Sequence, residues 1–219
     1  MIITKKTRLI PAPFVGTVVR IRVGAGLAFK FRAGVLAAGS DHVTVSWGDG
    51  AVEEFAAGLA DVGHDYPSPG EYVIEISDDV TSVCIGDSDE TSDACTVYAP
   101  MVTRVSSNAS RLVTFPSYSF QNCCNMMMFD VAGSSLAALF SGVFKSCRAL
   151  EGELRFPNVS RLVGITPQFA GCTKVAALHF AREHESAITS SSGYKADPTL
   201  GTGVEGVCRF DLPEEIPRR

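Results

Sequence analysis

Apolar and polar residues alternate in two stretches of the N-terminal part of the chain. Between residues 43 and 47 every second residue is apolar, ending at Trp47, and Tyr72, Ile74 and Ile76 repeat the pattern further on. A period of two is typical of a strand that buries one face. The two stretches therefore predict two β-strands over a common core, with Trp47 buried against Tyr72 or Ile74.

Turn-forming residues bound both predicted strands. Gly48-Asp49-Gly50 follows the first strand, where its glycines suit the positive φ angles of a tight turn, and Pro69-Gly70 precedes the second. An Asp in such a turn usually accepts hydrogen bonds from its own backbone. We therefore expect Asp49 to cap the turn rather than to bind a metal or act as a catalytic acid.

Together these segments resemble the PKD domain, an immunoglobulin-like adhesive module. In that family a Trp or Phe precedes a Gly-Asp-Gly turn, as Trp47 precedes Asp49 here. A His-x-Tyr-x-x-Pro-Gly-x-Tyr segment also opens a late strand, and His64, Tyr66 and Tyr72 match it. Family members usually carry an Asp directly after the Trp, where this chain has a glycine. The resemblance implies a PKD-like β-sandwich in which His64 has a structural role.

The second half of the chain carries a repeat. Three Phe-x-x-Cys segments are spaced 24 and then 25 residues apart, namely Phe120 with Cys123, Phe144 with Cys147, and Phe169 with Cys172. Each is preceded by a Ser-x-Leu segment and followed by apolar residues that fit a short strand. A fixed period of this length indicates a solenoid. We therefore expect the three cysteines to stack above one another inside it, buried and unpaired.

This pattern resembles the BspA-like leucine-rich repeat of bacterial surface proteins, which runs Ala-Phe-x-x-Cys-x-x-Leu before a strand and a Pro. The segment from Phe144 to Pro157 fits best, while Met126 and Val175 stand where Leu is usual. The stretches 80–85 and 97–102 are interpreted as degenerate first repeats, because terminal repeats of a stack are often atypical.

The chain is therefore expected to be mainly β with minor α, in three parts. A PKD-like β-sandwich over residues 1–79 precedes BspA-like leucine-rich repeats over 80–180 and a C-terminal cap and tail over 181–219. Within the cap, helix-forming residues over 181–188 come before an alternating, strand-like stretch at 207–212.

The charge balance and the apolar runs argue against several classes of partner. The chain has 19 basic and 24 acidic residues, a net charge of −5, and no basic stripe that would neutralise phosphates, so no nucleic-acid partner is expected. No apolar run approaches the ~20 residues of a membrane-spanning helix, and the N-terminus lacks the apolar core of a signal peptide. As written, the chain is expected to be soluble and not exported, unless a leader was removed.

Cysteines and carboxylates offer two candidate metal sites, and neither is favoured. The seven cysteines include no Cys-x-x-Cys arrangement, so neither a zinc site nor a complete disulfide framework is expected. The acidic loop 87–93 holds four carboxylates but lacks the Gly and the distal Glu of an EF-hand. A solvated loop is the favoured interpretation, and calcium binding is left open. Of the three methionines at 126–128, at least one is expected to fill the core.

The histidines give no catalytic signature. His42, His64, His179 and His184 have no His-x-x-x-His spacing, and none lies near a Gly-x-Ser-x-Gly segment. A dyad of Cys172 with His179 is the nearest alternative, but a thiol stacked in a dry core has a raised pKa and little access. We therefore predict no catalytic residue, no cofactor and no metal.

Both predicted modules are of a kind that offers a binding surface, and neither is expected to carry a catalytic site. The resulting hypothesis is a non-enzymatic adhesion or interaction protein that binds a protein or glycan on a cell surface through exposed strands of the repeats. The alternative is a fibre or decoration protein of a phage-type particle, assembled inside a cell. A hydrolase with an accessory module ranks third. No membrane insertion is expected, and self-association is left open.

Overall fold

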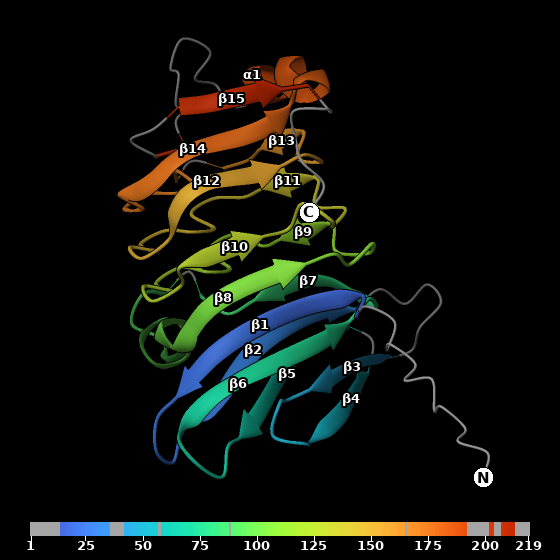
Figure 1. Cartoon of the computed structure of the whole chain (residues 1–219), viewed down its shortest axis with the longest axis vertical. Helices are drawn as coiled ribbons and strands as arrows, with labels where there is room; N and C mark the ends of the chain where they lie inside the picture. Colours follow the sequence, from blue (N-terminus) through green and yellow to red (C-terminus); the bar gives the residue numbers. More distant parts are fainter. Residues whose placement is uncertain are drawn as a thin grey trace, which may run out of the picture.

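The structure is a computed structural model that describes residues 14–35, 42–56, 58–87, 89–164, 166–191, 202–203 and 207–212. It is mainly β, with 44% strand and 11% helix, and includes a solenoid-like region of about three turns, which confirms the expected class at that level (Figure 1). The described strands are β1 (Gly16–Val23), β2 (Ala28–Val35), β3 (His42–Ser46), β4 (Val52–Ala56), β5 (Gly58–Asp65), β6 (Gly70–Ser77), β7 (Val80–Cys84), β8 (Val102–Ser107), β9 (Thr114–Phe115), β10 (Met128–Asp130), β11 (Ala138–Leu139), β12 (Glu151–Phe156), β13 (Arg161–Leu162), β14 (Lys174–Ala181) and β15 (Val207–Asp211). The described helical segments are a π-helical turn at Ala94–Tyr98, 3₁₀ turns at Ala99–Met101 and Arg182–His184, and helix α1 at Glu185–Ser191.

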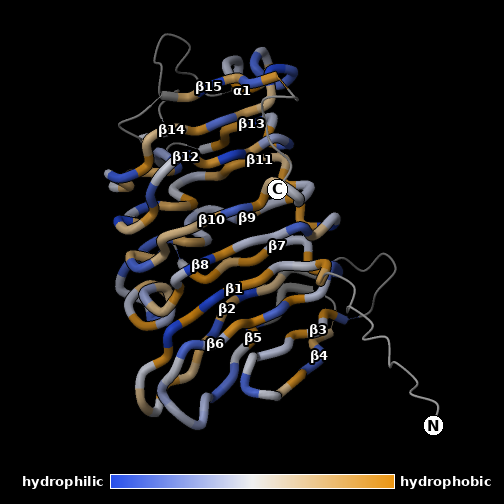
Figure 2. The backbone as a smooth tube through the Cα atoms, viewed as in Figure 1, coloured by the Kyte–Doolittle hydropathy of each residue, from blue (hydrophilic) through white to orange (hydrophobic). Residues whose placement is uncertain are grey.

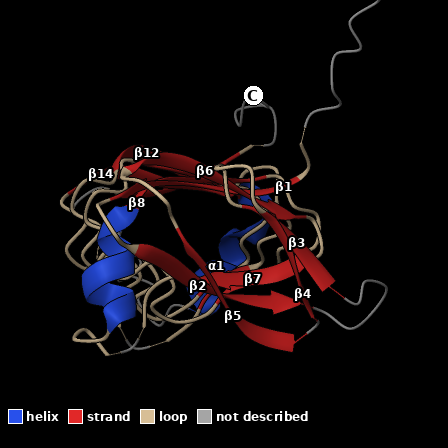
Figure 3. Ribbon diagram, turned by 90° about the horizontal axis from the view of Figure 1, so that it is seen from below, coloured by secondary structure: helices blue, strands red, loops and turns tan. Residues whose placement is uncertain are grey.

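Two six-stranded sheets lie face to face. The front sheet has strand order β10-β8-β1-β6-β3-β4, the back sheet has order β13-β11-β9-β7-β2-β5, and a C-terminal sheet has order β12-β14-β15. Figure 1 shows the C-terminal sheet continuing the stack beyond β10, and Figure 3, seen along the stack, shows the two layers. Buried side chains of both layers form one hydrophobic cluster that extends from Val19 in β1 to Ile188 in α1.

Each six-stranded sheet contains strands from both sides of residue 80, where the sequence predicts a domain boundary. In the front sheet, β1 pairs antiparallel with β6 on one side and with β8 on the other. In the back sheet, β7 pairs antiparallel with β2 and parallel with β9. Strands from before and after residue 80 therefore share hydrogen-bond ladders and one core. The division into 1–79, 80–180 and 181–219 stays a prediction from sequence pattern.

Beyond β8, two turns of the chain each add one strand to the front layer and a shorter one to the back layer, first β10 with β11 and then β12 with β13. β10 pairs in parallel with β8, and β11 pairs in parallel with β9 and β13. The strands of the C-terminal sheet are also parallel. The third side of each turn carries the Phe-x-x-Cys segments, and we call it the Phe-Cys side. Its backbone is paired as well, since Phe120 N–H donates to Val143 O at 2.8 Å and Phe144 N–H donates to Gln168 O at 2.8 Å.

The stretches interpreted as degenerate first repeats differ from the later turns. Residues 80–84 form β7 of the back sheet, but Ala94–Tyr98 is a π-helical turn and Ala99–Met101 a 3₁₀ turn that leads into β8. Pro100 lies in the 3₁₀ turn, where its lack of an N–H group costs no ladder hydrogen bond. Strand structure at 97–102 thus begins only at Val102.

The C-terminal segment covers the end of the stack. Helix α1 follows β14 and contacts β13, and β15 pairs in parallel with β14 (Figure 1). These two elements agree with the predicted helix and last strand, while the predicted tail, 213–219, lies outside the described residues. Within the described ranges, none of the helical segments is long and apolar enough to cross a lipid bilayer.

Candidate functional site

The Gly-Asp-Gly turn and His64 join the edges of the two sheets. The turn connects β3 to β4, the edge strand of the front sheet, and His64 lies on β5, the edge strand of the back sheet. His64 Nε2 lies 2.7 Å from Asp49 Oδ2, and its Nδ1 lies 3.3 Å from Glu53 Oε1. Each ring nitrogen of His64 therefore faces a carboxylate. These three side chains hold β4 against β5, so each of them has a structural role.

Asp49 also caps its own turn, as predicted. Its Oδ1 accepts the N–H of Ala51 at 2.9 Å, and Trp47 N–H donates to Ala51 O at 3.0 Å. The glycines on either side of Asp49 have φ angles of +84° and +101°, which only glycine adopts readily. The hydrogen bond with His64, followed by that from Ala51 N–H, holds the pKa of Asp49 below its usual range.

Trp47 is fully buried, as expected, and Ile74, one of its two predicted partners, is fully buried in the same hydrophobic cluster on the strand that pairs with β3. The indole stacks on the His64 ring with centroids 5.0 Å apart and planes 13° from parallel. Phe31 and Phe55 meet it edge to face at 5.9 Å and 6.5 Å. Tyr72, the other predicted partner, packs against a second tyrosine.

That second tyrosine is Tyr66, which ties the cluster together. Its ring centroid lies 4.1 Å from that of Tyr72, and its hydroxyl donates to Trp47 O at 3.1 Å. Burial, followed by the charge of Asp49, raises the pKa of Tyr66, so the hydroxyl stays protonated and remains a donor. The residues Trp47, Asp49, His64, Tyr66 and Tyr72, predicted as a sandwich signature, form one contiguous cluster.

The repeat residues stack on the Phe-Cys side. The Phe120 and Phe144 rings are 5.7 Å apart and 8° from parallel, and Phe144 and Phe169 are 4.7 Å apart and 19° from parallel. Cys147 Sγ donates to Phe120 O at 3.0 Å, and Cys172 Sγ donates to Phe144 O at 2.9 Å. Each of these two thiols therefore hydrogen-bonds to the preceding turn, a use that the spacing of the repeat alone does not indicate.

The environment of these thiols opposes nucleophilic chemistry. Cys123, Cys147 and Cys172 are buried and unpaired, as expected. Burial, followed by the hydrogen bond with Cys123, raises the pKa of Cys147, and the hydrogen bond with Cys147, followed by burial, raises that of Cys172. The alternative dyad of Cys172 with His179 is not formed, because the ring nitrogens of His179 face carboxylates of β12 and β15.

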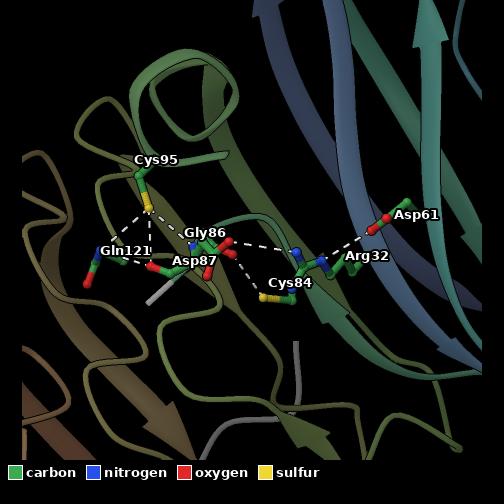
Figure 4. Close-up of polar contacts among 7 residues, drawn as sticks. All are labelled: Arg32, Asp61, Cys84, Gly86, Asp87, Cys95 and Gln121. Carbon is green, nitrogen blue, oxygen red and sulfur yellow. Dashed lines mark hydrogen bonds and ion pairs between the residues drawn. The ribbon is translucent and has the colours of Figure 1, made fainter. Parts of the chain in front are cut away.

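A polar cluster joins the N-terminal strands to the first turn of the solenoid (Figure 4). Arg32 on β2 lies 3.1 Å from Asp61 on β5 and 3.7 Å from Asp87, which follows β7. Cys84 Sγ donates to Gly86 O at 3.1 Å. Arg32 and Asp87 are 55 residues apart in the sequence, so no local sequence pattern could predict that they form an ion pair.

The same cluster continues to the Phe-Cys side through Asp87. Asp87 O accepts the amide of Gln121 at 3.0 Å and the thiol of Cys95 at 3.3 Å, and Cys95 Sγ accepts Asp87 N–H at 3.2 Å (Figure 4). A Cβ at Gly86 would lie 2.3 Å from Tyr118 O, so only glycine permits this approach of the two backbones. The cluster connects the N-terminal strands to the Phe-Cys side, and it was not predicted from the sequence.

The acidic loop is held by its own residues and by the solenoid. Asp89 Oδ1 accepts both the N–H and the hydroxyl of Thr91, and Glu90 pairs with Lys145. Among the residues that the structure describes, no group of three His, Cys, Asp or Glu side chains is arranged to hold a metal ion.

The outward surface of β1, β8, β10, β12, β14 and β15, which we call the front face, is the candidate binding surface (Figure 1). On β10, Phe129 is buried while Met128 and Asp130 are exposed, and on β8 Val105 is buried while Arg104 is exposed. Figure 2 shows hydrophilic and hydrophobic residues mixed along these strands. The front face therefore presents rows of side chains in strand register.

His179 is buried behind the front face, and, like His64, it has a carboxylate next to each ring nitrogen. Its Nδ1 contacts Asp211 on β15, and its Nε2 lies 3.3 Å from Glu153 on β12. Arg155 lies 3.8 Å from the same Glu153 oxygen. The imidazole thus bridges the two outer strands of the C-terminal sheet across β14.

An open groove borders the front face where the turn between β1 and β2 approaches the 3₁₀ turn before β8. Arg22, Leu27, Met101 and Met127 contribute to its lining. Met127 is 57% exposed, whereas Met126 is buried in the core, so the expectation that at least one methionine of this run points inward is met. The groove joins apolar side chains to the margin of the front face.

Comparisons of the chain with protein-family models, with curated proteins and with solved structures found no match.

Proposed function

We propose that this chain is a non-enzymatic adhesion or interaction protein that binds a protein or glycan on a cell surface through the front face. In this proposal the strands before residue 80 are a PKD-like β-sandwich, and the turns beyond it are BspA-like leucine-rich repeats. The supporting observation is the separation of roles between the layers of each turn. Aromatic rings and thiols fill the interior, while the front face presents exposed charged and apolar side chains in register.

The polar groups that suggest chemistry are used for structure, which favours binding over catalysis. Both ring nitrogens of His64 and both of His179 lie next to carboxylates. Asp49 holds its turn, and the Cys147 and Cys172 thiols bond to backbone carbonyls. A general base needs a free lone pair within reach of a substrate. Asp49, His64, Cys147 and Cys172 are engaged in hydrogen bonds, and Nε2 of His179 is buried next to Glu153.

Arrays of proteins and glycans probed with the full chain test the proposal. We expect binding to at least one immobilised protein or glycan. Substitution of exposed front-face residues should weaken that binding, and substitution on the back sheet should not. If no arrayed molecule bound the folded chain, the adhesion proposal would fail.

A structural component of a phage-type particle is the second candidate, and the thiols favour it. Five cysteines, Cys84, Cys95, Cys123, Cys147 and Cys172, are buried free thiols, which suits assembly in a reducing compartment. Size-exclusion chromatography with light scattering separates the two candidates. A trimer or larger closed assembly would favour the particle component, and a monomer would favour the adhesion protein.

A further inference from the structure

A row of arginine side chains crosses the front face, with Met128 and the buried His179 among them. Arg20 on β1 lies directly opposite Arg104 on β8, which in turn lies opposite Met128 on β10. β12 follows β10 in the stack and contacts it (Figure 1). Phe129 of β10 packs against Phe156 of β12 with ring centroids 6.3 Å apart, so Met128 and Arg155, which precede them, occupy equivalent positions. In the C-terminal sheet, Arg155 lies opposite His179 on β14, and His179 lies opposite Arg209 on β15. We call the four arginines among these the arginine row.

The charge of this row is incompletely neutralised. Like charges directly opposite on neighbouring strands repel one another. Arg20 and Arg104 are both exposed, and within the described part of the chain no carboxylate makes a salt bridge with either, or with the exposed Arg209. By contrast, Arg22 on the same strand pairs with Glu71 at 2.6 Å. An anion seated between Arg20 and Arg104 would relieve their repulsion.

The spacing of the row fits a polymer with regularly placed anionic groups. Adjacent strands are ~4.8 Å apart, so positions separated by one intervening strand recur at about 9.6 Å. Arg104, Arg155 and Arg209 have one strand between each neighbouring pair, β10 and then β14; β14 pairs with both of its neighbours, whereas β10 pairs with β8 and contacts β12. The interval from Arg155 to Arg209 is therefore close to the length of a disaccharide. The exposed Met128 side chain lies between Arg104 and Arg155 and offers an apolar contact for a sugar ring.

An acidic peptide fits the same surface less well. The row runs across strands that are paired within their sheets, so a peptide lying along it gains no main-chain ladder as it would at a sheet edge. Same-face side chains of an extended peptide also recur at about 6.7 Å, not at two strand spacings. Carboxylate or sulfate groups on a glycan need only the side chains, and the planar guanidinium binds either group with two parallel hydrogen bonds.

We propose that the arginine row binds an extended acidic glycan, with one anionic group between Arg20 and Arg104 and further groups at Arg155 and Arg209. This inference rests on the proposed adhesion function and names its ligand class.

The test measures binding of the full chain to immobilised heparin, polygalacturonate, uncharged dextran and poly-glutamate. We expect heparin or polygalacturonate to bind, and the comparison tells sulfate from carboxylate. Raising the salt from about 0.05 M to about 0.5 M should weaken binding strongly, because exposed charges are then screened within a few ångströms. Arg104→Ser and Arg209→Ser should each weaken it about tenfold, the loss expected for one charge-assisted contact.

The charge-matched control is Arg161→Ser, which removes an exposed arginine from β13 of the back sheet and should change binding less than about twofold. The assignment is overturned if Arg161→Ser weakens binding as much as Arg104→Ser, if poly-glutamate binds as tightly as the glycans, or if neither acidic glycan binds. In the last case, binding of another protein or of a neutral glycan in the arrays leaves the adhesion function standing. If the chain bound none of the arrayed or immobilised molecules, both the glycan assignment and the adhesion function would be contradicted.

Discussion

At the residue scale, Asp49 acts through two hydrogen bonds that can be separated. One caps the turn through Ala51 N–H, and the other holds His64 of the opposite sheet. An Asn at this position keeps an acceptor for Ala51 N–H but loses the charge, whereas an Ala loses both. The pair of substitutions therefore distinguishes the cap from the ion pair.

We expect Asp49→Asn to lower the free energy of unfolding at pH 7 by about 1 kcal/mol and Asp49→Ala by about 2 kcal/mol. The pKa of Asp49 is lowered in the folded chain, so its contribution is present above the usual range near pH 4 and is lost as the pH falls through the folded value. The difference between parent and Asp49→Asn should therefore shrink as the pH is lowered below the usual carboxyl range in urea unfolding experiments. Equal stability of parent and Asp49→Asn at pH 7 would contradict this role.

The cysteines give a second prediction at this scale. Cys124 and Cys208 are half-buried, whereas the three repeat thiols are fully buried and the pKa values of two of these are raised. A thiol reagent at about pH 8 should label the half-buried pair first and reach Cys123, Cys147 and Cys172 only as fast as the chain unfolds. Rapid labelling of all three in the folded chain would overturn the stacking described for the Phe-Cys side.

At the scale of the repeat, the residue before each Cys adopts a left-handed backbone conformation. The φ angles are +61° at Asn122, +64° at Ser146 and +79° at Gly171. Asn and Gly tolerate this region, whereas Ser pays a steric cost there. The three turns thus share one backbone conformation, but their residues differ in the steric cost of adopting it.

Exchange of these residues tests that shape. Ser146→Gly should raise the free energy of unfolding by about 0.5–1 kcal/mol, because the relieved left-handed strain exceeds the extra chain entropy of glycine. Gly171→Ser should lower it by about 1 kcal/mol for the same reason. Chemical denaturation of the two variants beside the parent measures both. A stabilising Gly171→Ser would show that φ is not the controlling variable.

The stacking of the repeat residues could be predicted from the sequence because their spacing is nearly constant. Phe120, Phe144 and Phe169 recur at a nearly constant interval, and a constant interval stacks equivalent residues whatever the detailed shape of the turn. The Trp47 cluster was foreseen for a related reason, since its turn and strand signals are local. The stacking of His64 on Trp47 and the polar cluster at Arg32 were not, because they depend on how distant strand edges meet.

At the scale of the whole molecule, pairing between distant strands creates features that no local pattern contains. Arg20 and Arg104 are neighbours only because β1 pairs with β8, and 84 residues separate them in the sequence. The same pairing joins the N-terminal strands to the solenoid within one sheet and over one hydrophobic cluster. The central claim is therefore that the described elements form a single cooperative unit behind one continuous front face.

The most direct test of this claim uses Trp47, the single tryptophan of the chain, as a reporter for the N-terminal strands. Phe144→Ala, deep in the solenoid, should destabilise the chain by about 3–5 kcal/mol, and Val113→Ala, at a 42% exposed side chain, by less than about 0.5 kcal/mol. Unfolding of each variant is followed by Trp47 fluorescence and by far-ultraviolet circular dichroism. We predict that Phe144→Ala moves the midpoints of both signals down together. An unchanged Trp47 midpoint, with loss of circular dichroism at lower denaturant, would contradict the claim and show two units that unfold independently.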